Sequence, residues 1–249
     1  MRRSPDETAD TLEIIDATAD VQSEVSRMPV VAGIAKLRVL SRAGSISMPV
    51  ELSVQTSTGL HRGVHMSRLV KAANGRRAGG MEQWLRWICG EVNRTQPGSS
   101  VTAAFELPYD DQFAKITMRA THRGAVTYQY VVEGMTACPC SKKMIGIGHM
   151  QRAQLTLVLR SDKALDSMKV VGRISECFSA SPREHMKRLE EAKKILEAQA
   201  NPRFAEDLVR ECVGRFPNAL FVSSRCYESI HAHDAIATWS ARPGWMPVI

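Results

Sequence analysis

Long apolar segments and aromatic residues are scarce in this chain of 249 residues. The longest apolar run, MPVVAGIA at 28–35, contains proline and glycine and is too short to cross a bilayer. The first residues, MRRSPDETAD, begin basic and turn acidic, without the apolar stretch of a signal peptide. Only 6% of residues are aromatic, and none interleaves with a basic run to stack on bases. We therefore expect neither a membrane nor a nucleic-acid partner.

Disulfide bonds are also not expected. The six cysteines stand in a chain long enough to bury a large core without cross-links. Cys89, Cys177 and Cys212 fall within helical patterns and are interpreted as buried small apolar residues. This usage predicts a reducing, cytoplasmic location. The net charge of +7 is spread along the chain, which suits a phosphorylated small substrate.

Hydrophobic periodicity predicts an α+β fold. Alternating patterns predict strands within residues 36–55, 101–108, 113–122, 125–134, 153–160, 219–228 and 231–240. Helical spacing predicts helices at 66–73, 81–94, 168–178 and 204–216, and the charged segment 183–199 is expected to be a further helix. Each half of the chain then has the order β-β-α-α-β-β, which favours an antiparallel sheet with helices on one face. We expect a polar arm at 1–30, a first module at 31–122 and a second at 123–249.

The segment TACPCSKKMIGIGHMQR, residues 136–152, is a candidate metal-binding loop. Its Cys138 and Cys140 are spaced by one proline, which matches neither the redox Cys-X-X-Cys motif nor the paired knuckles of a structural zinc site. One thiolate with His149 and a carboxylate from elsewhere would leave a coordination position open for water, as a catalytic metal requires. The alternative is that both thiols are ordinary loop residues.

A second candidate cluster is ESIHAHDA, residues 228–235. If the segment from His231 is a strand, His231 and His233 lie on one face, with Glu228 just upstream. Two imidazoles and a carboxylate can bind a metal or exchange protons near neutral pH. The alternative is an exposed polar strand edge.

Other charged residues have weaker local signals. In RGVHMSRL, residues 62–69, His65 and Arg68 stand where a strand gives way to a helix and could face an anion; the alternative is that Ser67 only caps the helix. Glu206 and Glu191 both fall on helix surfaces that composition predicts to face solvent.

Six motifs occur in a fixed order along most of the chain: DVQ at 20–22, GVHMSR at 63–68, ACPCS at 137–141, HMQR at 149–152, NPRFAEDLVR at 201–210 and ESIHAHDA at 228–235. This ordered set resembles the type IB GTP cyclohydrolases, whose fold is two tandem tunnelling-fold (T-fold) modules. The resemblance implies opening of the guanine imidazole ring of GTP, with release of formate and formation of 7,8-dihydroneopterin triphosphate, the first step of folate and pterin biosynthesis. It also implies a homotetramer with active sites at subunit interfaces.

The resemblance further implies roles for residues. Cys138 and His149 match metal ligands, and a third ligand aligns with Glu191. This chain has Leu-Glu-Glu-Ala at 189–192 where the family usually has Pro-Asp-Glu-Lys, so Glu190 is a rival. Such a ligand set accommodates Zn, Mn or Fe(II). The acid–base cluster matches Glu228, His231 and His233, and the carboxylate that binds the guanine edge matches Glu206.

The candidates for triphosphate binding are His65, Arg68, Lys142 and Arg152. Cys140 is expected to shape the loop without binding the metal. Met150 stands where bacterial members usually have asparagine and is similar to archaeal relatives, which release a dihydroneopterin cyclic phosphate; that product is an alternative. Two further alternatives are a T-fold enzyme that uses Cys138 or Cys140 as a nucleophile on a purine-like substrate, and a nonenzymatic module with a structural metal.

Overall fold

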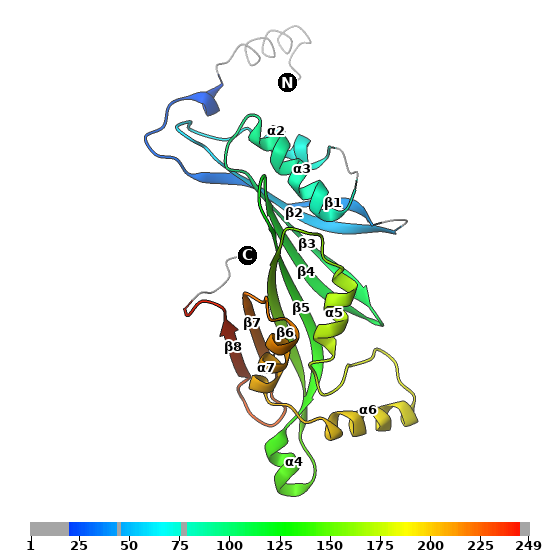
Figure 1. Ribbon diagram of the computed structural model, residues 1–249. Coiled ribbons are helices and arrows are strands. Elements are labelled where there is room, and N and C mark those ends of the chain that lie inside the picture. The colour runs from blue at the N-terminus through cyan, green and yellow to red at the C-terminus, as the bar shows by residue number, and fades with distance from the viewer. Residues whose placement is uncertain (1–19, 44–45, 76–78, 245–249) are drawn as a thin grey trace, which may run out of the picture.

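The fold is built on one antiparallel sheet (Figure 1). The structure, a computed structural model, describes residues 20–43, 46–75 and 79–244. The strands are β1 (Val31–Ala43), β2 (Ile46–Ser57), β3 (Ser100–Tyr109), β4 (Gln112–Thr121), β5 (Val126–Ala137), β6 (Met150–Ser161), β7 (Phe221–Cys226) and β8 (Ala235–Ser240). Each strand pairs with the next one in the chain, so the sheet order is β1 through β8. The predicted α+β class with an antiparallel sheet is confirmed.

Six α-helices lie in the described part of the chain: α2 (Met66–Ala73), α3 (Met81–Asn93), α4 (Pro139–Ile145), α5 (Ser167–Ser175), α6 (Arg188–Ala200) and α7 (Ala205–Arg215). A short 3-10 turn, η1, spans Val21–Ser23. The first half has the predicted order β-β-α-α-β-β. The second half differs, since α4 stands between β5 and β6, whereas the charged α6 before α7 is the further helix predicted within 183–199. A helix as short as α4 shows too little periodicity to be recognised, although Pro139 in its first turn favours a helix start.

The hydrophobic core lies between the sheet and the helices. On β5 the alternate residues Val126, Tyr128, Tyr130 and Val132 are buried, as their period of two predicts. Buried helix residues such as Leu85 and Leu208 pack into the same core. Each fully buried leucine stabilises the fold by roughly 1.5–3 kcal/mol. The core and the β4–β5 pairing continue across the expected boundary at 122/123, so the division into two modules stays a prediction.

The two ends of the sheet carry different elements. In Figure 1, α2 and α3 cover the end formed by the first strands, whereas α4 and α6 lie at the opposite end. There, the last turn of α6 buries Ala198 in a small separate cluster with Ala137 and Ala180, against which Met150 packs. The last turn of α6 therefore packs beside the end of β5 and the start of β6, which flank the predicted metal loop.

One predicted strand begins later than expected. β8 starts at Ala235, which pairs with Cys226, so His231 and His233 belong to the β7–β8 connection. An ion pair of 2.7 Å between Arg225 and Asp234 closes this connection at its base. None of the described helices is both long and apolar enough for a transmembrane segment. Residues 1–19 of the expected arm lie outside the described residues.

Candidate active site

Cys138 and His149 are neighbours across the β5–β6 hairpin. The last pair of the ladder joins Ala137 to Met150, and in the next pair the backbone N–H of Cys138 donates to the carbonyl oxygen of His149 at 2.9 Å. Residues directly opposite each other on antiparallel strands project from the same face. The hairpin therefore places a thiol and an imidazole side by side, although ten residues separate them in the sequence.

Gly148 allows this close approach. A Cβ atom at Gly148 would lie 2.6 Å from the carbonyl oxygen of Cys138, a contact that real side chains do not make. The intervening helix α4 is capped at its C-terminal end by Gly146, whose φ of 80° lies in the left-handed region that favours glycine. The two glycines of KKMIGIGH thus allow the left-handed end of α4 and the close approach of the backbone to Cys138.

His149 is held by a network of polar side chains. Its Nδ1 atom lies 2.9 Å from Oε1 of Gln151, and Nε2 of Gln151 donates to Oε1 of Glu228 at 3.5 Å. The other carboxylate oxygen of Glu228 lies 3.9 Å from the same Nδ1. The side chains of His149 and Glu228 are only 15% and 11% exposed, so this network is shielded from water.

The β7–β8 connection brings the second predicted cluster to the same place. Nδ1 of His231 lies 3.2 Å from Glu228 Oε2, and the His231 and His233 rings stack with centroids 5.3 Å apart. The His149 and His231 rings meet edge to face, with centroids 6.0 Å apart. The backbone N–H of Tyr227 donates to the carbonyl of Arg152 and fixes the connection to β6. The predicted histidine pair is thus side by side, but the reason given for it, a shared strand face, is wrong.

Beneath this cluster lies a thiol that takes no part in the predicted chemistry. Burial raises the pKa of Cys226 to about 11, against an opposing hydrogen bond from Thr136. The negative charges of Glu228 and Glu206 add to the rise. The Cys226 thiol therefore stays protonated at neutral pH. The negative charges of Glu206 and Glu228 both act on this one thiol.

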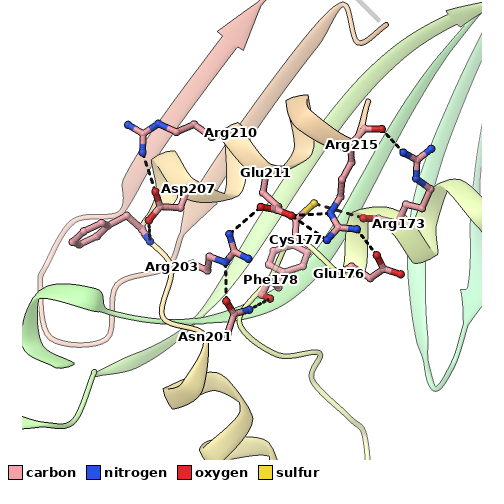
Figure 2. Close-up of polar contacts among 11 residues, drawn as sticks. Arg173, Glu176, Cys177, Phe178, Asn201, Arg203, Asp207, Arg210, Glu211 and Arg215 are labelled. Carbon is pink, nitrogen blue, oxygen red and sulfur yellow. Dashed lines mark hydrogen bonds and ion pairs between the residues drawn. The ribbon is translucent and has the colours of Figure 1, made fainter. Parts of the chain in front are cut away.

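Polar contacts within and around the motif NPRFAEDLVR hold the start of α7, the helix turn that contains Glu206 (Figure 2). The Asp207 carboxylate accepts from the Phe204 N–H and from Arg210, both at 2.9 Å, while Arg203 binds Asn201 and Glu211. Figure 2 shows these contacts continuing through Arg215 to Glu176, which ties α7 to α5.

Glu206 itself remains available. It is exposed in the first turn of α7, and it forms no hydrogen bond or ion pair with any described residue. The hydroxyl of Ser224 donates to the Ala205 carbonyl at 2.8 Å, which joins the start of α7 to β7, the strand that leads into the histidine connection. The other polar side chains of the motif hold the structure, whereas the Glu206 carboxylate faces solvent.

The predicted third metal ligand lies elsewhere in this structure. Glu191 is exposed in the first turn of α6, and the Glu190 side chain caps that helix by accepting from the Lys187 N–H at 2.8 Å. The helix is fixed to the metal loop at its other end, by Gln199, which lies about 12 Å along the axis from Glu191. Within the described ranges no three His, Cys, Asp or Glu side chains form a group that could hold a metal ion.

His65 and Arg68 line a different cavity, of about 270 Å³, together with Gln22 and residues near the start of β3. Nε2 of His65 lies 3.3 Å from the Asp20 carboxylate, so the motifs DVQ and GVHMSR meet. His65 occupies the N-cap position of α2, so Ser67 is inside the helix and is not the cap. The cavity adjoins β2 and is four strands from β6, about 19 Å. Within one chain, this cavity therefore does not lie next to His149.

The two remaining phosphate candidates are also separated. Arg152 follows Gln151 on β6 and therefore projects from the opposite face of the sheet, where its guanidinium pairs with Glu133. Lys142 lies on α4, and its backbone N–H bonds to Cys138. Cys140 is exposed on the same helix, with its sulfur 3.8 Å from that of Met144.

Sequence reasoning missed two glutamines. Gln151 was detectable, because it stands two residues after His149 on a strand and so shares its face. Gln199 was not detectable, since it lies in a charged helical segment and only the tertiary structure brings it to Gly148.

Comparisons with known proteins agree with the motifs. The family model described as "Type I GTP cyclohydrolase folE2" matches residues 24–237. GTP cyclohydrolase FolE2 of Pseudothermotoga lettingae is 29% identical over 214 residues, which cover 78% of this chain and 81% of the relative. GTP cyclohydrolase MptA of Picrophilus torridus is 29% identical over 178 residues, covering 60% and 64%. A crystal structure of uricase from Arthrobacter globiformis aligns with a TM-score of 0.47 at 10% identity, over 91% of this chain and 98% of that one. Because the family model spans most of the sequence, this chain belongs to the type I GTP cyclohydrolases of the folE2 kind.

Proposed function

We propose that this protein opens the imidazole ring of GTP, releases C8 as formate and forms 7,8-dihydroneopterin triphosphate. The observation that supports it best is the convergence of His149, Glu228 and His231 beside Cys138, in a chain of this family. The reaction needs a hydrolytic centre and groups that exchange protons near neutral pH, and this cluster supplies residue types suited to both.

Cys138 and His149 fit two ligands of a divalent metal. Nδ1 of His149 is engaged by Gln151, which leaves Nε2 for the ion. The family is metal-dependent in general, and Zn, Mn and Fe(II) all suit a thiolate and imidazole set. When bound, the metal would lower the pKa of a water molecule so that hydroxide is available near neutral pH. A carboxylate from Glu191 would have to arrive by movement of α6 or from a neighbouring chain.

His231 and His233 are proposed to exchange protons with the purine nitrogens and the sugar. His231 is half-exposed, so its ring can reach a substrate. Its Nδ1 faces the Glu228 carboxylate, an acceptor, so Nε2 is the nitrogen that can take up a proton and return it. Glu228 is then the residue that orients the imidazole and balances its positive charge.

Glu206 is proposed to bind the guanine edge. Its exposed carboxylate can accept two hydrogen bonds, from N1–H and from the 2-amino group of guanine. Adenine lacks both donors and would leave the carboxylate unpaired. The other motif residues of α7 are occupied by structural contacts, which leaves Glu206 for this role.

The site is proposed to be completed in a homotetramer of tandem T-fold modules. His65 and Arg68 are too far from His149 to share one GTP molecule within a chain, so a neighbouring chain would supply them for the triphosphate, with Lys142 and Arg152 as further candidates. Exposed apolar side chains support an interface at this end of the sheet: Met144, Ile145, Ile147 and Ile230 are each at least 65% exposed.

A cyclic phosphate product is the second candidate, because one matching relative carries the name MptA. The side chain that suggested this branch, Met150, packs against the small cluster of Ala137, Ala180 and Ala198 beneath α6. Its identity therefore does not bear directly on the chemistry of the product.

The test is an anaerobic assay of the metal-loaded protein with GTP, run separately with zinc, manganese and iron(II). We expect formate, and a pterin that fluoresces after oxidation and whose mass separates triphosphate from cyclic phosphate. C138A should abolish both products. Ring opening that persists in C138A would contradict the metal site, and activity that survives a chelator would favour a cysteine nucleophile.

A further inference from the structure

Gln151 lies between the proposed metal ligand and the proposed acid–base cluster. It is only 8% exposed, and its position on β6 places it in a row across three elements. Thr136 on β5 is its direct partner on one side. On the other side, the last pair of the β6–β7 ladder joins Ala153 to Cys226. Continuing this register by two residues places Gln151 opposite Glu228. Gln151 is thus buried beside Glu228, and His149, the other group that it bonds, stands two residues before it in the chain.

The directions of its hydrogen bonds follow from chemistry. The Glu228 carboxylate can only accept, so the NH₂ group of Gln151 must face it. The amide oxygen then faces His149, and because that oxygen can only accept, Nδ1 of His149 must be the donor. In the neutral ring this leaves Nε2 without a proton and with its lone pair free.

Among the described residues, no other contact of His149 fixes this choice. The direct approach to Glu228, at 3.9 Å, is longer than a hydrogen bond. The Ser229 hydroxyl lies 3.5 Å from Nδ1 and can either donate or accept, so it permits both tautomers. The 2.9 Å contact with Gln151 is the shortest of the three.

We propose that Gln151 is a positioning residue that sets the tautomer of His149, turning the lone pair of Nε2 toward the metal, and that ties His149 to Glu228. His149 and His231 both direct an N–H toward the same carboxylate, one through the Gln151 amide and the other directly. The metal ligand and the proton-exchanging histidine therefore share one anchor. This inference rests on the proposed function, since it assumes that His149 binds a metal.

Two substitutions separate the two parts of the role. Q151M keeps the length of the side chain and removes both hydrogen bonds. Q151E keeps an acceptor for Nδ1 of His149 but places a second carboxylate against Glu228. The matched control is Q154M, because Gln154 is half-buried on the same strand and projects from the opposite face.

The experiment uses the full-length protein, first metal-free and then titrated with zinc against a chromophoric chelator. Ring nitrogen shifts in ¹⁵N NMR, assigned with H149A, report the tautomer of His149. We expect a protonated Nδ1 in the wild type, in Q151E and in Q154M, and a mixture of tautomers in Q151M. Zinc affinity should fall by about 10–100-fold in Q151M and stay unchanged in Q154M. Q151E should lower kcat more than it raises KM for GTP, since Glu228 loses its donor.

Wild-type tautomer and zinc affinity in a folded Q151M would overturn the inference. If Q151M does not fold, Q151E decides it, because a neutral His149 ring with its proton on Nε2 in that variant is incompatible with the proposal. The proposed function fails separately, when H149A binds zinc as tightly as the wild type. In that case the NMR comparison still tests the tautomer.

Discussion

The side-chain amide of Gln199 spans both backbone polar groups of Gly148. Its Oε1 atom accepts from the Gly148 N–H and its Nε2 donates to the Gly148 carbonyl, each at 2.8 Å. Between α6 and α7, the backbone N–H of Arg203 donates to the carbonyl oxygen of Ala137 at 3.0 Å. The end of α6 and the segment that follows it are therefore bonded to both sides of the hairpin that carries Cys138 and His149, to Gly148 just before β6 and to Ala137 at the end of β5.

Replacing Gln199 should loosen that hairpin. Q199M removes two hydrogen bonds, worth about 1–3 kcal/mol of unfolding free energy together. Zinc affinity should fall as well, because Gly148 is joined directly to His149. Urea unfolding and chelator competition measure the two effects. E197Q, an exposed change on the same helix, is the control, and equal behaviour of the two variants would contradict a role for the amide.

G148A should be more damaging than a glycine-to-alanine change usually is. The added Cβ would lie 2.6 Å from a backbone oxygen of Cys138, so the hairpin must shift. We expect a loss of about 1–3 kcal/mol in unfolding free energy and a loss of turnover with GTP. G214A is the matched control, because its Cβ meets nothing within 4 Å on the surface of α7. It should be neutral or stabilising by about 0.5–1 kcal/mol, and a G148A protein as stable as G214A would refute the packing argument.

E206Q should impair guanine recognition and leave the fold intact. Replacing the carboxylate by an amide loses a charged acceptor worth about 1.5–3 kcal/mol, or roughly 10–100-fold in kcat/KM for GTP. The preference for GTP over ATP should narrow by a similar factor. Steady-state kinetics with both nucleotides measure this, and thermal unfolding should be unchanged. An unaltered preference for GTP would remove Glu206 from the site.

The ion pairs of α7 should make stability depend on acid pH. Burial alone would raise the pKa of Glu211, but the hydrogen bonds and charges of Arg203 and Arg215 outweigh it and hold the pKa below its usual value. The folded state then binds fewer protons than the unfolded state at Glu211, so this contribution is present at neutral pH. It is lost as the pH falls from the usual glutamate range through the lowered pKa. Melting temperature should drop less steeply with acid in E211Q than in the wild type, and parallel curves would contradict the assignment.

Much of the fold was predictable from local patterns. The helix predicted at residues 66–73 is confirmed with the same ends, and the charged segment before NPRF is the helix α6. Burial of Cys89, Cys177 and Cys212 is confirmed too. The predictions that failed depend on context. α4 is too short for a period to show, and the strand expected from His231 begins at Ala235, where pairing with Cys226 starts.

Sequence motifs also predicted the family, which the comparisons confirm, but they did not predict which motif residues meet within a chain. Arg152 follows Gln151 directly, yet the strand pleat turns it to the other face. His65 and Arg68 are part of the same ordered motif set, yet the cavity that they line adjoins β2, and three strands lie between β2 and β6. The motifs indicate which residues the family uses. The distances between those residues within one chain are set by strand order and register in the sheet.

The sequence by itself determined the helices and strands other than α4, and the chemical types available at the site, because periodicity and motif composition are local properties. Only the tertiary structure decided that Cys138 lies beside His149 and that Gln151 joins His149 to Glu228. The physical reason is strand register. Hydrogen bonding between antiparallel strands brings together residues that are far apart in the chain, and the strict alternation of faces decides which of them can touch.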